Sequence, residues 1–590
     1  MKASDYIIDF IHKQGTDHVF GYIGGAITHL VDSMDKMTIV KYIQVYHEQT
    51  AALAAEGYAK NSGKTGVAMA TSGPGATNLM TGIADAYFDS VPVVFITGQV
   101  NTYEFKYNKP IRQQGFQETD IVSIVRPITK YATIISDPQK IRYELEKAFY
   151  MANEGRPGPV VLDIPMDIQR AEIDPEKLEG FSPKKEGTQT TEEISEKAFQ
   201  EVVTLFKQSK RPIILAGGGI IRGKAEKELL RFAKNNRIPV VTSLMGKGCF
   251  PEDDDLFVGV IGAYGNRCAN ISLANSDLLF ALGSRMDTRQ IGTLLKSFLR
   301  GGKIIHVDLD KNEIEHHRLE HRIKIRSDVK TFLEKMNNRR EAKEAQAEWL
   351  SYVRKTKEKY SQVKEVEKNC ANKLPYEIMW LIDKYAKEDQ MYCVDVGQNQ
   401  MFAFQALQIR GNQKFFTSGG LAPMGCAVPF AVGASFSDEK KKNIIVITGD
   451  GGLHMSVQAL MLISQYDLPI KVIVMNNYAL GMITQFQDLY FDKKKVGTTK
   501  KGGYVVPNFK ALAKAYYLPY YKVDKKNLAT YREIIEKPGP CFIEVVIRGA
   551  TEVYPKLEVN NPIEDISPKL SREELKESMI IDPIDNKTAL

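Results

Sequence analysis

Two apolar runs near the C-terminal end, each closed by polar turn residues, most constrain how this chain can fold. Residues 443–448 precede Gly449-Asp450-Gly451, and residues 471–475 precede Asn476-Asn477. Short runs rich in Ile and Val that end at turn formers predict buried parallel strands. The residues between them, 452–468, predict a single crossover helix, so the segment is expected to form a βαβ unit.

The polar tips of these two strands indicate a ligand site. Parallel strands joined by a crossover end at the same edge of a sheet, which is where such folds bind ligands. Asp450 offers a carboxylate and Asn477 an amide oxygen, the hard donors that Mg²⁺ prefers. Two donors are too few without a phosphate-bearing ligand, so the pair predicts a metal–diphosphate site. Either dipeptide alone is also an ordinary turn.

Length and composition limit the classes of protein. A chain of 590 residues predicts three domains of ordinary size. The formal charge of +7 is spread along the chain, which gives little support to nucleic-acid binding. There is no signal-peptide pattern and no apolar window long enough for a bilayer. The six cysteines form no C-x-x-C pair, so reduced thiols and a cytoplasmic protein without a membrane partner are expected.

Helical and apolar segments alternate along most of the chain. This alternation predicts an α/β fold of three doubly wound parallel-sheet domains, over residues 1–180, 190–335 and 373–547. A polar linker over 183–193 and a long, mostly exposed charged helix over 336–372 are expected between them. Residues 548–590 predict a C-terminal arm that packs on something else. The first and third domains share one plan, in which an Ala- or Gly-rich helix is followed by an apolar strand and a glycine turn.

A carboxylate and a glycine turn stand out in the first domain. Glu48 lies at a strand-to-helix junction, where a first-turn glutamate is also favoured by the helix dipole alone. Residues 71–79 read Thr-Ser-Gly-Pro-Gly-Ala-Thr-Asn-Leu, a strand, glycine turn and helix in succession. Such a turn lets the backbone approach a ligand closely, although by itself it is weak evidence.

Together these segments resemble the acetolactate (acetohydroxyacid) synthase family of thiamine diphosphate enzymes. The matching segments are 47–49, 71–79, 155–159 with 163–165, 418–421, 449–451 and 476–477, and the resemblance runs from residue 1 to about 547. It implies a pyrimidine-binding domain, a central domain and a diphosphate-binding domain, in that order. It also implies an active site shared between two chains, hence at least a homodimer, with a tetramer as an alternative.

The resemblance assigns roles by position. Glu48 is implied to activate the pyrimidine N1′ of thiamine diphosphate from one subunit, while Asp450, Asn477 and the backbone of Ala479 hold Mg²⁺ from the other. Met424 resembles the bulky residue that bends the cofactor. The other residues implied to contact thiamine diphosphate are Gly24, Gly25, Gly73, Asn78, Gln398, Asn399, Ala422, Gly449, Gly451 and Met482.

The resemblance also covers the substrate side and the central domain. Phe116 and Gln117 stand in a segment that resembles the substrate-side loop and are implied to take part in catalysis. Arg289 matches an arginine expected near the carboxylate of the acceptor keto acid, a group that a guanidinium binds well. The central domain resembles an FAD-binding domain, with ADP or no nucleotide as alternatives. The residues implied there are Gly218, Gly219, Leu244, Met245, Gly262, Gly265, Arg285, Asp308 and Asp328.

Several positions depart from the family pattern. Phe486 stands in place of a tryptophan of the acceptor pocket, and Thr288 in place of an acidic residue. Asn399 stands where a histidine is usual, and Ile23 replaces a proline in a turn. Residues after 550 do not resemble the usual tail. Most of these changes bear on the second substrate rather than on the cofactor.

Three functions are therefore compared. The first is acetolactate synthase-like: pyruvate is decarboxylated and its two-carbon unit is joined to a second 2-keto acid. The second keeps the pyruvate half-reaction but transfers the unit to another carbonyl compound, such as a nucleotide-linked keto sugar. The third is a non-enzymatic binding protein on a borrowed fold. The presence of Glu48, Asp450 and Asn477 argues against the third.

Overall fold

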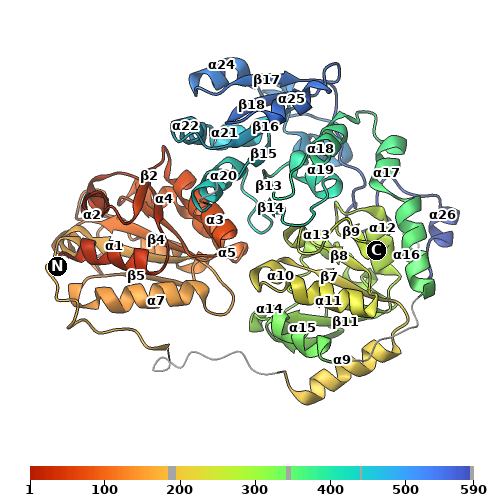
Figure 1. The fold of residues 1–590 in the computed structure, drawn as a ribbon, viewed down its shortest axis with the longest axis horizontal. Helices are drawn as coiled ribbons and strands as arrows, with labels where there is room; N and C mark the ends of the chain where they lie inside the picture. Colours follow the sequence, from red (N-terminus) through yellow and green to blue (C-terminus); the bar gives the residue numbers. More distant parts are fainter. Residues whose placement is uncertain (184–193, 340–346, 439–441, 585–590) are drawn as a thin grey trace.

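The computed structural model of the chain describes residues 1–183, 194–339, 347–438 and 442–584. It contains three parallel sheets of six strands each, with helices packed around them (Figure 1). This confirms the predicted fold class. The expected linker over 183–193 lies outside the described residues except for Pro183.

The N-terminal sheet has the strand order β2-β1-β3-β4-β6-β5. Its strands are β1 His18–Tyr22, β2 Lys41–Gln44, β3 Gly66–Ala70, β4 Val93–Gln99, β5 Tyr131–Ile134 and β6 Val160–Pro165. Its helices are α1 Ala3–Lys13, α2 Thr28–Met37, α3 Glu48–Ser62, α4 Pro74–Asn78, α5 Met80–Phe88, α6 Ile121–Val125, α7 Ile141–Asn153 and α8 Met166–Gln169. Strands β3, β4 and β6 are buried at every residue, because helices cover both faces of a parallel sheet.

The C-terminal sheet repeats this order as β14-β13-β15-β16-β18-β17. Its strands are β13 Met391–Val394, β14 Lys414–Phe416, β15 Ile444–Gly449, β16 Ile470–Asn476, β17 Tyr520–Val523 and β18 Cys541–Val546. Its helices are α18 Leu374–Lys384, α19 Gln398–Ala406, α20 Ala427–Phe436, α21 Asp450–Met455, α22 Leu460–Gln465, α23 Gly481–Tyr490, α24 Phe509–Ala515 and α25 Thr530–Glu536. The plan expected to be shared by the first and third domains is therefore present in both.

The central sheet has a different order, β12-β11-β10-β7-β8-β9. Its strands are β7 Pro212–Ala216, β8 Val240–Thr242, β9 Phe257–Val260, β10 Leu278–Leu282, β11 Lys303–Asp308 and β12 Arg322–Arg326. Its helices are α9 Glu196–Gln208, α10 Gly218–Arg222, α11 Glu226–Asn236, α12 Arg267–Ala274, α13 Thr288–Ile291, α14 Lys311–Glu315 and α15 Val329–Asn337. Followed from β9, this is the 3-2-1-4-5-6 order typical of dinucleotide-binding sheets.

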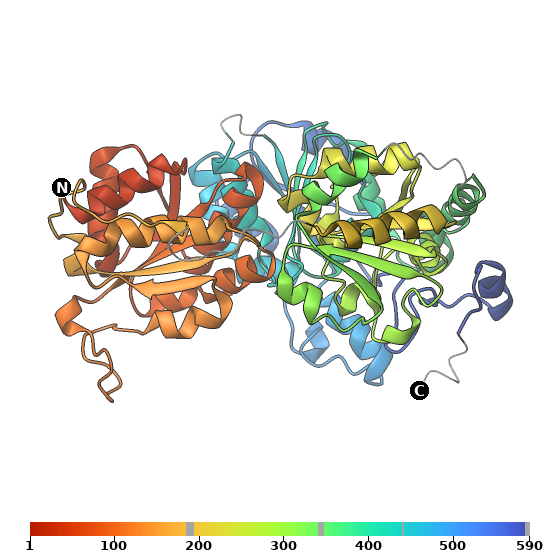
Figure 2. The same ribbon diagram turned by 90° about the horizontal axis from the view of Figure 1, so that it is seen from below.

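Helix α3 of the N-terminal unit packs on α20 of the C-terminal unit (Figures 1 and 2). A Cβ atom at Gly433 would lie 1.8 Å from the Ala54 carbonyl oxygen, and one at Gly57 would lie 2.3 Å from the Phe430 carbonyl oxygen. Glycine at both positions therefore lets the two backbones come into direct contact. One apolar core continues from the N-terminal sheet through this helix pair to the C-terminal sheet.

The predicted single crossover helix between β15 and β16 is wrong. The segment forms α21, a 3-10 turn over Val457–Ala459 and then α22. Ser456 interrupts the helix because its backbone has a φ of −140°. Helix α21 also begins earlier than expected, at Asp450 itself, so the strand leads into the helix without a loop.

The predicted long, mostly exposed helix after the central sheet is also wrong. Two helices, α16 Ala347–Lys359 and α17 Gln362–Asn369, occupy the described part of this segment. They are separated at Ser361, whose extended backbone precedes α17. The apolar residues Trp349, Leu350 and Val353 are buried in the central unit. Their helical spacing marks a face that packs against another element rather than an exposed linker.

The chain ends in an extended arm over residues 548–584, with one short helix, α26 Arg572–Glu577. The first residues of the arm contact Tyr376 and Gln398 of the C-terminal unit. Its later part lies along the central unit, beside α12 and α16 (Figure 1). The buried guanidinium of Arg267 on α12 donates to the carbonyl oxygens of Ile566 and Pro568 in the arm. Glu365 on α17 pairs with the same guanidinium. The arm therefore packs on another part of the molecule, as expected.

Two further features concern the cysteines and the helices. All six cysteines are buried and free. Within the described ranges, no helix combines the length and the apolar composition needed to cross a membrane.

Candidate active site

The predicted site residues gather where the strand order of each sheet reverses. In doubly wound sheets, ligands bind at this switch point, outside the carboxyl ends of the strands. The reversal falls between β1 and β3, between β13 and β15, and between β7 and β10. The residues at or after the carboxyl ends of these strands include Gly24, Gly25, Gly73, Gln398, Asn399, Gly449, Asp450, Gly218, Gly219 and Arg285.

Asp450 is buried at the end of β15 with one carboxylate oxygen unpartnered. Its Oδ1 accepts hydrogen bonds from the Tyr504 hydroxyl at 3.0 Å and from the Gly451 amide at 2.7 Å. Its Oδ2 is buried and has no hydrogen-bond partner among the described residues. Burial raises the pKa of this carboxyl to about 6, against the opposing effect of the Tyr504 hydroxyl. A cation would satisfy such an oxygen and favour its charged form.

Asn477 lies beside Asp450, because β15 and β16 pair in parallel and end together. The Asn477 Nδ2 group donates to the Thr551 hydroxyl at 2.8 Å, and its Oδ1 accepts from the Ala479 amide at 3.2 Å. The predicted pair of strand tips is thus brought together with Ala479. A carboxylate, an amide oxygen and a backbone carbonyl fit Mg²⁺ when phosphate oxygens complete the shell.

Close backbone approaches bring further predicted residues to this edge. A Cβ at Gly451 would lie 3.4 Å from the Met424 methyl carbon, and one at Gly449 would lie 3.1 Å from Asn399 Oδ1. Ala422, in the same loop as Met424, has a φ of +59°, an unusual conformation for a residue with a side chain. Such strain clusters at ligand sites, and Ala422 is one of the positions implied to contact thiamine diphosphate.

Asp395, which was not predicted as a site residue, holds this edge together. Its Oδ1 accepts from the backbone amides of Gly425 and Cys426 at 2.8 and 3.0 Å, and its Oδ2 accepts from the Thr448 hydroxyl at 2.8 Å. One buried carboxylate thus fixes the start of α20 to β15. Its place directly after β13 is the signal that could have identified it.

Glu48 is the first residue of α3 and is 7% exposed. The Asn78 amide group donates to its Oε2 at 2.9 Å. A Cβ at Gly75 would lie 3.3 Å from its Oε1. The β2–α3 junction and the turn over 71–79 are therefore brought together, with Asn78 orienting the carboxyl group.

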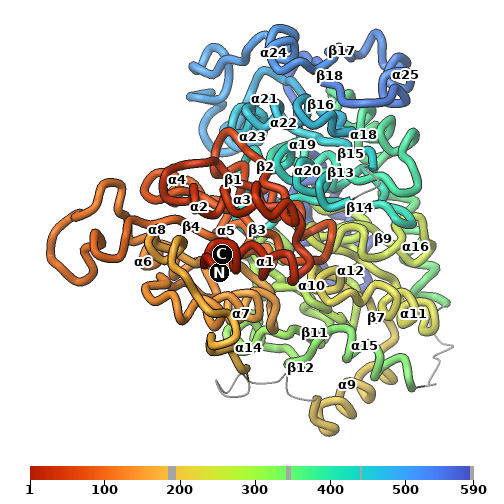
Figure 3. Tube along the Cα trace, turned by 60° about the vertical axis from the view of Figure 1, so that its left-hand side comes forward, coloured from red at the N-terminus to blue at the C-terminus, as the bar shows by residue number. Residues whose placement is uncertain are grey.

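The loop from β4 to α6, which carries Phe116 and Gln117, projects from the N-terminal unit (Figure 3). A Cβ at Gly73, whose φ is +62°, would lie 2.9 Å from the Gln117 carbonyl oxygen. Gln117 is thus brought to the glycine turn. Phe116 is 86% exposed and points away from the described residues. Gly24 packs on Thr71, whereas the space beside Gly25 is open.

A cavity of about 1100 Å³ lies where the three units meet at the central switch point. Most of the positions implied for FAD line it: Gly218, Gly219, Leu244, Met245, Arg285, Asp308 and Asp328. Gly262 and Gly265 do not line it, whereas Tyr264 between them does. Burial raises the pKa of Asp308 to about 6. Lys60, Asp89 and Arg156 of the N-terminal unit also line the cavity, and none of them was predicted to do so.

The two predicted acceptor-side residues lie on different units. Arg289 lines the central cavity, and Phe486 is a half-exposed residue of α23 whose ring lies 4.8 Å from that of Tyr490. No hydrogen bond or ring contact between Arg289 and Phe486 occurs in the described structure. Tyr264 connects their surroundings, because it lines the cavity and its hydroxyl lies 3.3 Å from the Met482 sulfur on α23.

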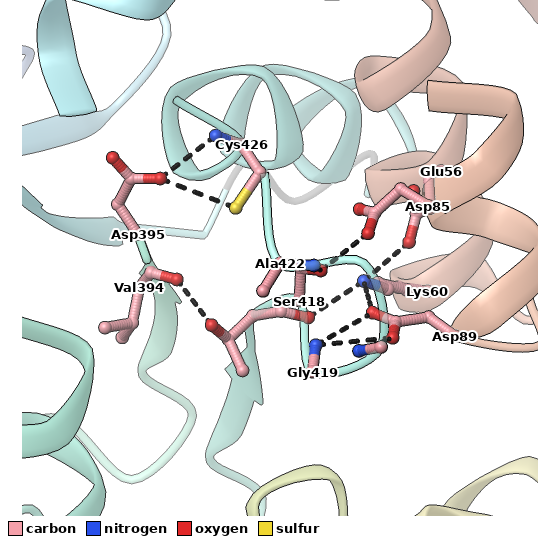
Figure 4. A network of polar contacts seen from close by, with 12 residues as sticks. Glu56, Lys60, Asp85, Asp89, Val394, Asp395, Ser418, Gly419, Ala422 and Cys426 are labelled. Atoms are coloured by element: carbon pink, nitrogen blue, oxygen red, sulfur yellow. Dashed lines mark hydrogen bonds and ion pairs between the residues drawn. The ribbon is translucent and has the colours of Figure 1, made fainter. Parts of the chain in front are cut away.

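A buried charge cluster joins the N-terminal unit to the loop over 417–422 (Figure 4). Lys60 pairs with Glu56 at 2.7 Å and with Asp89 at 3.4 Å, and it donates to the Thr417 carbonyl at 3.0 Å. Burial, followed by the charges of Glu56 and Asp89, holds the pKa of Asp85 well above its usual range.

The acidic members of this cluster accept hydrogen bonds from the loop directly. The Ser418 hydroxyl donates to Asp85 Oδ1, and the Gly420 amide donates to Asp89 Oδ1 at 2.8 Å. The Ser418 oxygen in turn accepts from the Ala422 amide at 3.0 Å. The backbone of Ala422, whose φ is positive, is therefore held in place by residues of the N-terminal unit.

Comparison with protein families identifies the class. Three family models match: "Thiamine pyrophosphate enzyme, N-terminal TPP binding domain" over residues 1–124, the central domain over 199–336, and the C-terminal TPP binding domain over 395–545. Together with the geometry at the three switch points, these matches define a thiamine pyrophosphate enzyme.

Individual relatives show which family within this class the chain resembles. The acetolactate synthase large subunit of Lactococcus lactis is 36% identical over 94% of both chains. The probable acetolactate synthase large subunit of Methanocaldococcus jannaschii is 36% identical over 98% of both. Acetolactate synthase 2, chloroplastic, of Nicotiana tabacum is 33% identical over 96% of this chain and 85% of its own. The chain belongs to the acetolactate synthase family.

Proposed function

We propose that this chain is a thiamine diphosphate- and Mg²⁺-dependent enzyme that decarboxylates pyruvate and joins the two-carbon unit to a second 2-keto acid. The observation that carries the proposal is the unpartnered, buried Oδ2 of Asp450 beside Asn477 at the C-terminal switch point. Family membership and the Glu48–Asn78 pair support it.

Thiamine diphosphate, when bound, supplies the carbon nucleophile and the electron sink for this chemistry. The chain's own residues would bind and orient it. Asp450, the Asn477 oxygen and the Ala479 carbonyl would hold Mg²⁺. The glycines at 449 and 451 let the backbone beside Asp450 pack closely on neighbouring side chains, because a Cβ at either position would meet one of them.

Glu48 would hold the proton needed at the pyrimidine ring. The Asn78 amide occupies Oε2, so Oε1 is left to face the glycine turn and to exchange a proton with a ring nitrogen. Burial of Glu48 excludes water from this exchange. The carboxyl geometry is thus set by the N-terminal unit alone.

A homodimer is the proposed minimum unit. No hydrogen bond described in the structure joins Glu48 to Asp450 or Asn477. Large apolar side chains near the two half-sites are also exposed, among them Phe116, Leu421, Met455 and Tyr478. A second copy that places its N-terminal unit against this C-terminal unit would bury these side chains and complete the site.

The central cavity is the proposed site of FAD. Its volume of about 1100 Å³ and the 3-2-1-4-5-6 strand order suit a dinucleotide. Gly217 supports the same assignment, because a Cβ there would lie 2.2 Å from the Gly283 carbonyl oxygen at the switch point. A yellow purified protein with a flavin spectrum after denaturation is the expected result. Colourless protein that binds ADP instead would contradict it.

The acceptor is proposed to be a 2-keto acid. The relatives are named acetolactate synthases, and a nucleotide-linked sugar acceptor is not favoured. The test is incubation of the purified protein with labelled pyruvate, alone and with candidate acceptors, followed by NMR of the products. Acetolactate and CO₂ from pyruvate alone are expected. Turnover only with a sugar acceptor would overturn the assignment, and Asp450→Ala is the inactive control.

A further inference from the structure

Thr551, near the start of the C-terminal arm, lies at the proposed metal site. Thr551 is 8% exposed, and its hydroxyl lies 2.8 Å from Asn477 Nδ2 and 2.6 Å from Gln398 Oε1. The Thr551 carbonyl oxygen accepts from Gln398 Nε2 at 2.9 Å. One residue of the arm therefore contacts both a proposed metal ligand and a proposed diphosphate contact.

These hydrogen bonds run in one direction only, because backbone groups fix it. The Thr551 carbonyl can only accept, so it requires the NH₂ group of Gln398. Gln398 Oε1 then faces the Thr551 hydroxyl, which must donate its single proton to that oxygen. The hydroxyl oxygen is left to accept, and Asn477 must present its NH₂ group to it.

Val553 fixes the same direction from a second side. Its amide donates to Gln485 Oε1 at 3.1 Å, and its carbonyl accepts from Gln485 Nε2 at 3.2 Å. Gln485 Oε1 also accepts from Gln398 Nε2 at 3.2 Å. Both glutamine side chains are therefore held by the backbone of the arm.

This hydrogen-bond network determines which way the side-chain amide of Asn477 faces. The Thr551 hydroxyl oxygen accepts from Nδ2. The Ala479 amide can only donate, and it donates to Oδ1 at 3.2 Å, so both groups hold the same orientation. An asparagine binds a cation through its oxygen, and a reversed amide would present NH₂ instead. The packing is tight, since a Cβ at Gly481 would lie 2.1 Å from Gln398 Oε1 and 2.7 Å from Asn477 Nδ2.

We propose that Thr551 is a positioning residue whose hydroxyl, together with the Ala479 backbone amide, holds the direction of the Asn477 amide and so presents the oxygen of that side chain to the metal. The inference rests on the proposed role of Asn477 as a Mg²⁺ ligand. It assigns a role to an arm segment that does not resemble the usual family tail. The arm thus contributes to metal binding without donating a ligand.

The test measures Mg²⁺ binding to the full-length protein in excess thiamine diphosphate by isothermal titration calorimetry. Thr551→Val removes the hydroxyl at constant shape and is expected to raise the Mg²⁺ Kd about tenfold or more, as loss of an orienting partner does. Thr551→Ser keeps the hydroxyl and is expected to stay close to wild type. Thr498→Val is the matched control, because that buried hydroxyl binds Gln487 and has no part in this network.

Asn477→Asp separates orientation from packing. An aspartate presents an oxygen on either side, so its direction does not matter, and adding Thr551→Val to it is expected to cost little further Mg²⁺ affinity. A Thr551→Val penalty as large in Asn477→Asp as in wild type would overturn the inference, and so would equal Mg²⁺ Kd values for wild type and Thr551→Val. Wild-type protein that binds no thiamine diphosphate with Mg²⁺ would instead overturn the proposed function and, with it, this role.

Discussion

Glu48 and Lys60 lie near opposite ends of the same helix, α3, and face different units of the molecule. Glu48 begins the helix beside Asn78, whereas Lys60 donates to the Thr417 carbonyl of the C-terminal unit. The helix therefore ties the proposed proton-holding group to the loop that carries Ala422 and Met424. Substitutions in the charge cluster around Lys60 test this connection.

Asp85→Asn and Asp89→Asn are expected to differ although both remove a buried carboxyl group. The pKa of Asp85 is held well above its usual range, first by burial and then by Glu56 and Asp89. Burial and its acidic neighbours favour the protonated form of Asp85, which an asparagine resembles, so the expected loss of unfolding free energy is about 1 kcal/mol or less. Asp89→Asn breaks an ion pair with Lys60 and is expected to cost about 3 kcal/mol. Urea unfolding of both variants measures this, and equal losses would contradict it.

Mg²⁺ binding is expected to weaken in mild acid. The pKa of Asp450 is raised to about 6 by burial in the absence of a cation, and the proton must leave before the oxygen binds metal. The apparent Mg²⁺ Kd should be constant above about pH 7 and rise about tenfold per pH unit below 6. Titration calorimetry between pH 5 and 8 measures the profile. Tyr504→Phe removes a stabilising hydrogen bond and should move the break to higher pH, whereas a flat profile in wild type would refute the assignment.

The same carboxyl group is expected to destabilise the metal-free protein at neutral pH. Its pKa of about 6 in the folded state lies above the ordinary 3.8, so the folded state binds the proton more tightly. The stability it contributes is present below pH 4 and lost as the pH rises through 6. Asp450→Asn should therefore raise the unfolding free energy of the metal-free protein at pH 7 by about 1–3 kcal/mol while abolishing Mg²⁺ binding. A variant less stable than wild type at pH 7 would be evidence against an ionised, desolvated carboxylate.

Glu48→Gln is expected to keep the fold and lose most pyruvate turnover. Glutamine retains the shape and an oxygen for Asn78 to bind, but it holds no exchangeable acidic proton. A loss of at least about a hundredfold in kcat is expected, because acid–base catalysis contributes that much or more. CO₂ release from pyruvate measures it, and unchanged binding of thiamine diphosphate shows that the site is intact. A wild-type rate of CO₂ release in this variant would contradict the proposed function.

Local pattern was enough to predict the parts of the site that follow strands. Asp450 and Asn477 were predicted because apolar β-branched runs end at them, and the parallel pairing of β15 with β16 brings them together. Glu48 was placed correctly at a helix start. In each case one strand or one junction fixes the position of the side chain.

Residues whose role depends on distant packing could not be predicted in this way. Glu56 and Lys60 have the i, i+4 spacing of an exposed ion pair, yet the side chains of both are buried. The Lys60 ammonium lies over the Phe430 ring of α20 and donates to the Thr417 carbonyl. Thr551 lies 153 residues from Gln398, and nothing local marks it. The helical pattern of residues 452–468 likewise does not predict the break at Ser456. Tertiary contacts override local propensity at these positions.

The contact between α3 and α20 can be tested at its narrowest point. In a helix with free space, Gly→Ala stabilises by about 1 kcal/mol. At Gly433 the new methyl carbon would lie 1.8 Å from the Ala54 carbonyl oxygen, which is backbone and cannot rotate away. Gly433→Ala is therefore expected to lower the unfolding free energy by about 1–3 kcal/mol, so the sign of the change distinguishes contact from free space.

Gly57→Ala, on the facing helix, is expected to behave like Gly433→Ala because its methyl carbon would meet the Phe430 carbonyl. The double variant should cost less than the sum of the two, since helices forced apart by one methyl group make room for the other. Turnover should fall with stability, because α3 also positions Glu48. Urea unfolding of the three variants with kcat measured in parallel is the test, and a Gly433→Ala protein more stable than wild type would exclude the close approach.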